Sequence, residues 1–149
     1  MVSKSTLRTD SWILIKDIIK NDSLVSDLVN GVYSAYPRKF VDYAEGLPFV
    51  VVNKPEITEY PLTLSNAAIY VYTIDFEIHI IVGGEDRAAQ TLKKIMDAVT
   101  KALDSNKNTI ATNGLENYTI ISEGTDFDFS KGKKIHYGTI RVRYNFNSD

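Results

Sequence analysis

The chain has 149 residues, of which 44% are hydrophobic and 24% are charged, and its formal net charge is −2. Its composition is that of a folded globular protein, and its length suits a single domain. The small negative charge argues against a dedicated nucleic-acid binder, which normally carries a basic excess. The absence of cysteine excludes disulfides, thiolate catalysis and cysteine-ligated metals, and it agrees with a reducing cytoplasm.

The first residues predict a flexible arm rather than a targeting segment. Residues 1–9 are polar and lack the apolar stretch of a signal peptide. No part of the sequence approaches the roughly 20 consecutive apolar residues that a membrane helix requires. We therefore expect one intracellular domain over residues 1–149, with the arm at its start.

Two short helices are predicted after the arm. Asp10 or Ser11 can cap the first helix, and Ser23 can cap the second, which Gly31 would end. Hydrophobic residues occupy more than one face of the first helix: Trp12, Ile13, Leu14, Ile15, Ile18 and Ile19. This pattern favours burial on two sides, against the domain's own core and against a neighbouring molecule, and Trp12 is a candidate for either role.

One short strand and two irregular segments follow. Residues 32–46 hold several aromatic residues and predict a mixed loop. The run Phe49–Val52 predicts a strand near a sheet edge, because prolines bound it at positions 48 and 55. Residues 53–68 show no clean period and contain two prolines, so they predict a long loop of the kind that engages a partner.

The longest regular pattern lies at residues 70–103. Over residues 70–82, hydrophobic side chains alternate with more polar ones, which predicts a strand with one buried face. The two glycines at 83–84 end the strand, and the acidic residues at 85–86 favour the start of a helix. Hydrophobic residues at helical spacing then predict one amphipathic helix that ends near residues 104–106.

Two strands are predicted at the end of the chain, over residues 118–123 and 134–146, with a polar connection at 106–114 and a hairpin loop at 124–132. The fold class is therefore α+β: an N-terminal helical segment precedes a β-β-α-β-β unit. In this unit a four-stranded, mostly antiparallel sheet packs on one long helix. The helix-facing side chains are expected to be Phe76, Ile78, Ile80, Ile140, Val142 and Tyr144.

The opposite face of this sheet gathers ionisable residues. Asp75, Glu77 and His79 alternate along one strand, while Arg141 and Arg143 alternate along the last strand. If the two strands are neighbours, opposite charges lie side by side. Such a cluster suits acid–base chemistry, a polar outer surface or a subunit interface. The interface hypothesis gives these candidate contact residues: Trp12, Asp75, Glu77, His79, Arg141 and Arg143.

Several other patterns resemble functional motifs without meeting their requirements. Residues 83–86 resemble a cyclic-dinucleotide synthase signature, which lies in a hairpin, whereas a helix follows here. Asp126, Asp128 and Ser130 have calcium-loop spacing, but the bidentate glutamate is missing. The two histidines form no metal-binding pair, and no serine lies in a nucleophile elbow. The sequence therefore predicts no catalytic residue, metal or cofactor.

The order and length of these elements resemble a known family. They are carried by residues 47–52, Tyr70–Ile81, Asp86–Leu103, Tyr118–Ser122 and Ile135–Phe146. Over residues 10–147 the chain resembles the tail-completion (tail terminator) proteins of long-tailed phages and related viruses. The resemblance rests on element order rather than on a motif, so it transfers no individual functional residue.

This resemblance implies a structural virion protein rather than an enzyme. It implies a ring, typically a hexamer, that caps the tail tube and joins it to the head-side connector. DNA would pass through the ring without sequence readout, and assembly would occur in the host cytoplasm, with the protein ending in the tail or neck. Two alternatives stay open: another neck or minor tail protein, such as a head-completion or stopper protein, and a small α+β enzyme or ligand-binding domain that uses the charged cluster.

Overall fold

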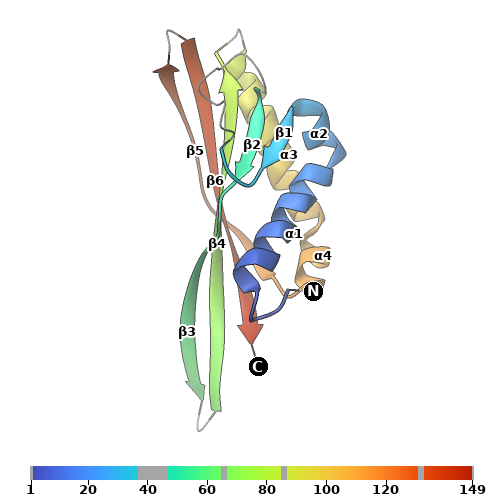
Figure 1. The fold of residues 1–149 in the computed structure, drawn as a ribbon, viewed down its shortest axis with the longest axis vertical. Coiled ribbons are helices and arrows are strands. Elements are labelled where there is room, and N and C mark those ends of the chain that lie inside the picture. Colours follow the sequence, from blue (N-terminus) through green and yellow to red (C-terminus); the bar gives the residue numbers. More distant parts are fainter. Residues whose placement is uncertain (1, 37–46, 65–66, 85–86, 131–132, 149) are drawn as a thin grey trace.

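The sheet is organised around β4 (Ala67–Gly83), whose alternating hydrophobic side chains face the helices. The computed structural model describes residues 2–36, 47–64, 67–84, 87–130 and 133–148. The other elements are α1 (Leu7–Asn21), α2 (Ser23–Leu28), β1 (Gly31–Tyr33), β2 (Phe49–Val52), β3 (Glu56–Leu64), α3 (Ala88–Ser105), α4 (Lys107–Thr112), β5 (Glu116–Ser130) and β6 (Lys133–Ser148). Figure 1 shows an elongated α+β molecule with its helices along one side of the sheet.

The sheet has six strands and is mixed. Its order is β1-β2-β4-β6-β5, and β3 also pairs with β4. The β1–β2 pair is parallel, and the other pairs are antiparallel. The predicted α+β class is therefore confirmed, whereas the prediction of four strands is wrong, because β1 is very short and β3 has no clear hydrophobic period, so the sequence predicts loops at both.

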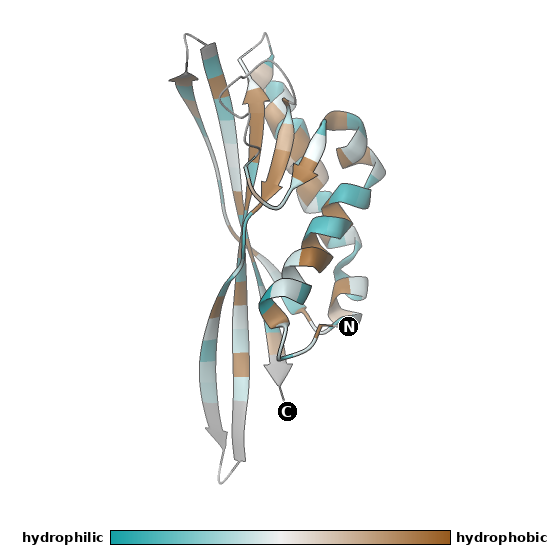
Figure 2. Ribbon diagram, viewed as in Figure 1, coloured by the Kyte–Doolittle hydropathy of each residue, from teal (hydrophilic) through white to brown (hydrophobic). Residues whose placement is uncertain are grey.

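The core lies between the sheet and α3. Phe76, Ile78 and Ile80 on β4 are fully buried, and they pair in register with Val142, Ile140 and Gly138 on β6. The helix contributes these buried residues: Leu92, Ile95, Met96, Val99 and Leu103. Each fully buried large side chain contributes about 1.5–3 kcal/mol to folding. Figure 2 shows hydrophobic residues concentrated where β1 and β2 meet the helices.

The N-terminal helices begin and end at other residues than predicted. Residues 7–9 belong to α1, and Val2 is buried and donates its backbone N–H to the Asn113 carbonyl over 3.1 Å, so these residues do not form a free arm. The cap of α2 is Asp22 rather than Ser23, because the Asp22 carboxylate accepts from the Val25 backbone N–H at 3.0 Å. Gly31 lies in β1 rather than at a helix end.

The predicted loop at 53–68 is largely a strand. β3 pairs with β4 along its whole length, from Glu56↔Asp75 to Leu64↔Ala67. β3 tolerates Pro61 because it is an edge strand at this point. Proline has no backbone N–H, and an edge strand has one side on which no neighbouring strand needs that hydrogen bond. Residues 53–55 form a bulge with one extra residue. Three residues lie between the last pair of β2 and the first pair of β3, whereas only two residues of β4 lie between the same two pairs.

Two further connections are more regular than expected. The segment 106–114 contains α4, and β5 continues through most of the predicted hairpin loop as far as Ser130. Gly138 on β6 lets α3 approach closely, because a Cβ there would lie 2.7 Å from Met96 Sδ. The acidic pair at 85–86, expected to start the helix, lies outside the described residues; α3 itself begins after Arg87, whose φ is 66°. Among the described helices, none is long and apolar enough to span a membrane.

Candidate functional site

The predicted charged cluster forms on the outer face of the sheet, opposite the helices. The register pairs Asp75 with Arg143 and Glu77 with Arg141, because β4 and β6 are neighbours. Arg143 donates from Nε and Nη2 to the two Asp75 carboxylate oxygens at 2.8 and 2.9 Å. This bidentate pair raises the pKa of the Arg143 guanidinium, first through the hydrogen bond and then through the charge of Asp75.

His79 lies beside these pairs and is held on both ring nitrogens. Its Nε2 lies 2.6 Å from Glu77 Oε1, and its Nδ1 is hydrogen-bonded to the Tyr36 hydroxyl. A carboxylate only accepts, so we assign the imidazole proton to Nε2, and Nδ1 then accepts from Tyr36. Burial, and then the nearby Tyr137 and Glu77, raise the pKa of the Tyr36 hydroxyl above its ordinary value.

The strand bulge adds polar groups next to this cluster. Asn53 donates its backbone N–H to the Glu77 carbonyl at 3.1 Å, and its side-chain nitrogen lies 3.4 Å from His79 Nε2. A cavity of about 210 Å³ lies here, lined by Asn53, Lys54, Glu56, Asp75, Phe76, Glu77 and Arg141. This is less than the ~300–1,000 Å³ typical of small-molecule sites. The partly exposed, paired charges therefore suit contact with another surface better than enclosure of a substrate.

Trp12 lies apart from the charged cluster, on the helical side of the sheet. It is partly buried against the core, and its indole Nε1–H donates to the Val52 carbonyl at 2.7 Å. Trp12 therefore anchors α1 to β2. Its predicted contact with a neighbouring molecule stays a prediction, as does the interface role of the other five residues.

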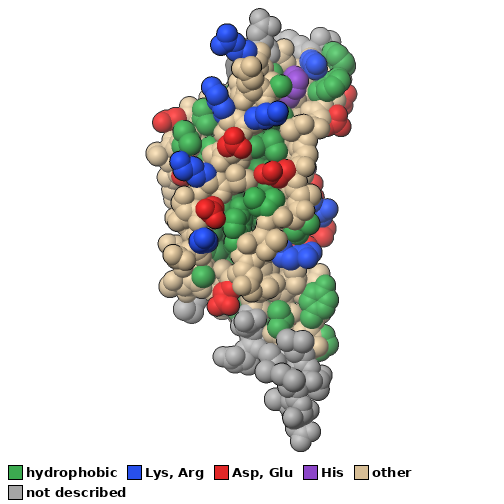
Figure 3. All heavy atoms as spheres, turned by 180° about the vertical axis from the view of Figure 1, so that it is seen from behind, with side chains coloured by type: hydrophobic (Ala, Val, Ile, Leu, Met, Phe, Trp, Pro, Cys, Tyr) green, Lys and Arg blue, Asp and Glu red, His purple; other side chains and the backbone are tan. Residues whose placement is uncertain are grey.

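The calcium-like motif lies in a strand. Asp126 and Asp128 are exposed on β5, and each carboxylate accepts the backbone N–H of the next residue at 2.7 Å. Nowhere in the described ranges do three histidine or acidic side chains gather as a metal site would require. The described charges are mixed over the surface: Figure 3 shows acidic and basic side chains interspersed over one whole face.

Two surface features were not found from the sequence. One is a groove of about 680 Å³ between α1 and the α3–α4 corner, and the other is a group of exposed aromatic side chains near the β5–β6 turn. The groove brings residues together that are distant in the chain, so no local pattern reveals it. The aromatic group lies on an alternating run, Asp126-Phe127-Asp128-Phe129, and this alternation is the local signal of the strand that extends through the predicted loop.

Comparison with known proteins supports the fold through structure alone. No protein-family model matches the chain, and no curated protein matches its sequence. Among solved structures, one similar chain comes from the "Virion of native gene transfer agent (GTA) particle". It matches with a TM-score of 0.62 and 18% identity, over 90% of this chain and 92% of that chain. At this level of identity, the likeness establishes a shared fold and does not by itself assign a function.

Proposed function

We propose that this chain is a structural component of a virion and has no enzymatic role. The observation that carries the proposal is the likeness in fold to a chain of the gene transfer agent virion, which extends over nearly the full length of both chains. The charged cluster is consistent with it, because its carboxylates are partly neutralised by arginines and the adjacent cavity is small.

Within that class, we propose the role of a tail terminator. The sequence resemblance supports it: the N-terminal helices, the long strand followed by one amphipathic helix, and the final hairpin occur in the expected order. In this role, copies of the chain form a ring, typically a hexamer, that caps the tail tube and meets the head-side connector. DNA passes through the ring without sequence readout. The protein resides in the tail or neck after assembly in the host cytoplasm.

The outer face of the sheet is the proposed interface with neighbouring molecules. Asp75, Glu77, Arg141 and Arg143 present alternating charges on a rigid pair of strands, and such patterns favour specific partners through complementary charge. His79 lies at the edge of this pattern, and Trp12 positions α1 on the other side of the sheet.

Deletion of the gene in a particle-producing host tests the proposal. We expect tail tubes of uncontrolled length that fail to join heads, as seen by negative-stain electron microscopy, because the cap that stops tube growth is missing. Restoring the unaltered gene should restore joined particles of uniform length. Tubes of normal length without heads would instead indicate a stopper or another neck protein. Normal particles that lack the chain would contradict a role in the virion.

A further inference from the structure

The turn end of the β5–β6 hairpin exposes aromatic side chains on one face. Phe127 is 52% exposed and Phe129 is 65% exposed. The register places His136 opposite Phe127 and Lys134 opposite Phe129. Directly opposite residues in an antiparallel pair share a face, as do residues two apart along a strand. These four side chains, Phe127, Phe129, Lys134 and His136, are called the tip face below.

The side chains of the tip face hold one another in place. The Phe127 and Phe129 rings meet edge to face with their centroids 6.2 Å apart. Lys134 Nζ lies 4.2 Å from the centroid of the Phe127 ring, so a positive charge lies directly on the aromatic surface. Figure 1 shows the hairpin end beyond α1 and α2 and about level with the start of α3, and Figure 3 shows hydrophobic side chains beside a histidine at the upper edge. The tip face is thus a protruding apolar surface with basic character.

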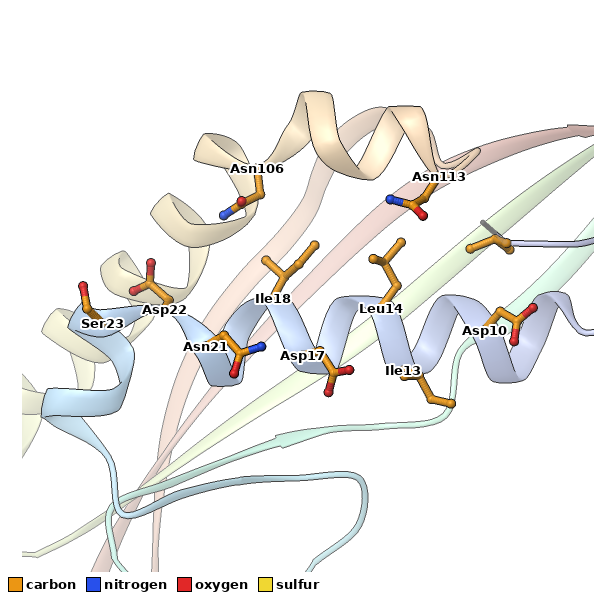
Figure 4. A pocket seen from close by; sticks show the side chains of 11 residues that line it. Asp10, Ile13, Leu14, Asp17, Ile18, Asn21, Asp22, Ser23, Asn106 and Asn113 are labelled. Atoms are coloured by element: carbon orange, nitrogen blue, oxygen red, sulfur yellow. The ribbon is translucent and has the colours of Figure 1, made fainter.

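The groove between α1 and α4 has the opposite character. Figure 4 shows Leu14 and Ile18 pointing from α1 toward α4, where they form an apolar floor, and both are partly buried against the core. The rim is polar: three aspartates and several amides line it, namely Asp10, Asp17, Asp22, Asn21, Asn106 and Asn113. None of the described residues that line the groove is basic.

Of the three rim carboxylates, two accept hydrogen bonds from described residues of this chain. Asp22 caps α2, and Asp10 accepts from the backbone N–H of Ser3 at 3.5 Å. Asp17 is exposed and forms no ion pair with any other residue that the structure describes. Ile13 lies beside Asp17 on the outer side of the groove and is 52% exposed. The groove therefore offers an apolar floor under a negative rim, with a volume of about 680 Å³.

We propose that the tip face of one copy of this chain docks into the α1–α4 groove of a second copy. The two surfaces are complementary in shape, since one protrudes and the other is concave, and in charge, since Lys134 would meet an acidic rim. They are two different surfaces that lie apart along the long axis of the molecule, so the contact joins different copies head to tail. A head-to-tail contact builds a ring when the rotation between copies closes.

Another exposed part of the chain fits the groove less well. β3 exposes Tyr60, but Glu56 shares that face of the strand and would be repelled by the aspartates of the rim. The tip face, by contrast, carries Lys134, while the acidic residues of that part of β5 point to the other face. Only the biological role of this contact, the building of a ring, rests on the proposed function. The docking itself is a property of the purified full-length chain and is measured without any other virion protein.

Two variants and their mixture test the contact. One variant, Phe127→Ser with Phe129→Ser, removes the tip face, and the other, Ile13→Lys with Asp17→Lys, alters the groove. Each should weaken self-association of the full-length chain about 30-fold or more in sedimentation velocity over a concentration series. An equimolar mixture should form a 1:1 dimer and nothing larger, because it contains one intact tip face and one intact groove per pair.

Controls separate docking from folding. All four substituted side chains are exposed, so far-UV circular dichroism and melting temperature should match those of the unaltered chain. Tyr60→Ser removes an equally exposed aromatic ring elsewhere and should leave self-association unchanged. An unaltered chain that stays monomeric up to its solubility limit would overturn the inference, as would a mixture that does not dimerise. Either result would leave the virion role intact, which the gene deletion tests separately.

Discussion

β2 and β3 pair with the same edge of β4, yet their surroundings differ. All four residues of β2 are buried, because both faces of the strand are covered. Val50 and Val52 lie in the main core under the helices, whereas Phe49 and Val51 pack with Ile81 and Ile135 on the other face of the sheet. In the first six residues of β3, only Ile57 is partly buried, because β4 is its sole neighbouring strand. The bulge at residues 53–55 separates the two regions. A strand's place in the core is thus decided by what covers it, since the hydrogen-bonded partner is the same.

The largest expected effect lies in the covered region. Ile95→Asp on α3 should unfold the domain, because it places an unpaired charge at a fully buried position, at a cost of about 4 kcal/mol or more. Chemical denaturation followed by circular dichroism measures this loss. Lys93→Asp on the exposed face of the same helix is the matched control and should cost about 0.5 kcal/mol or less. Equal losses for the two variants would mean that the helix faces are assigned wrongly.

Two glycines of the β5–β6 hairpin allow a covered position to be compared with an open one. Gly138→Ala should destabilise by about 1–3 kcal/mol, because the new methyl group would lie 2.7 Å from Met96 Sδ and 2.9 Å from Leu92 Cδ1. Gly124→Ala on β5 has no heavy atom within 4 Å of the new Cβ and should be nearly neutral. Thermal unfolding of both variants compares the two positions. A larger loss at Gly124 would contradict the packing described for α3.

The link between α1 and β2 is the next test. Trp12→Phe keeps an aromatic ring but removes the indole donor to the Val52 carbonyl, so we expect a loss of about 1–2 kcal/mol in the free energy of unfolding. The exposed Tyr60→Phe change on β3 is the counterpart and should have almost no effect. If Trp12→Phe were neutral for stability but weakened assembly, the predicted contact of Trp12 with a neighbour would gain support.

Two tyrosines make the covered region sensitive to alkaline pH. Burial raises the pKa of Tyr118 from 10.0 to about 12 and that of Tyr144 further still. The unfolded chain therefore loses these protons first, and stability should be constant below about pH 10 and fall from there through pH 12. Neither hydroxyl has a hydrogen-bond partner among the described residues, so Tyr144→Phe should retain stability at neutral pH and flatten the alkaline decline. Urea unfolding at several pH values measures this, and an unchanged slope would refute the assignment.

The smallest effect on stability is expected on the outer face. Arg143→Glu replaces a bidentate partner of Asp75 with a like charge, but both groups are partly solvated, so the melting temperature should fall only slightly. Assembly into particles should fall more than stability if this face is an interface. Arg87→Glu, an exposed arginine outside the cluster, serves as the control. Normal assembly with Arg143→Glu would argue against the interface.

The sequence predicts best those helices and strands that have one buried face and one exposed face. The alternation of β4 and the helical spacing of α3 predict these two elements correctly, because burial on one side imposes a period on the sequence. The same periodicity predicts that Asp75, Glu77, Arg141 and Arg143 share one face, and the register of β4 and β6 agrees. Tyr36 and Asn53, which complete the surroundings of His79, come from segments expected to be loops.

The sequence by itself determined the α+β class, the central strand and helix, and the charged outer face. Only the tertiary structure decided that residues 56–64 form a strand, that β5 reaches Ser130, and where the groove and the tip face lie. The reason is physical: an edge strand exposed to solvent needs no hydrophobic period and tolerates proline, so its backbone pairing leaves little trace in the sequence. A groove between helices depends on their packing, which local patterns do not encode.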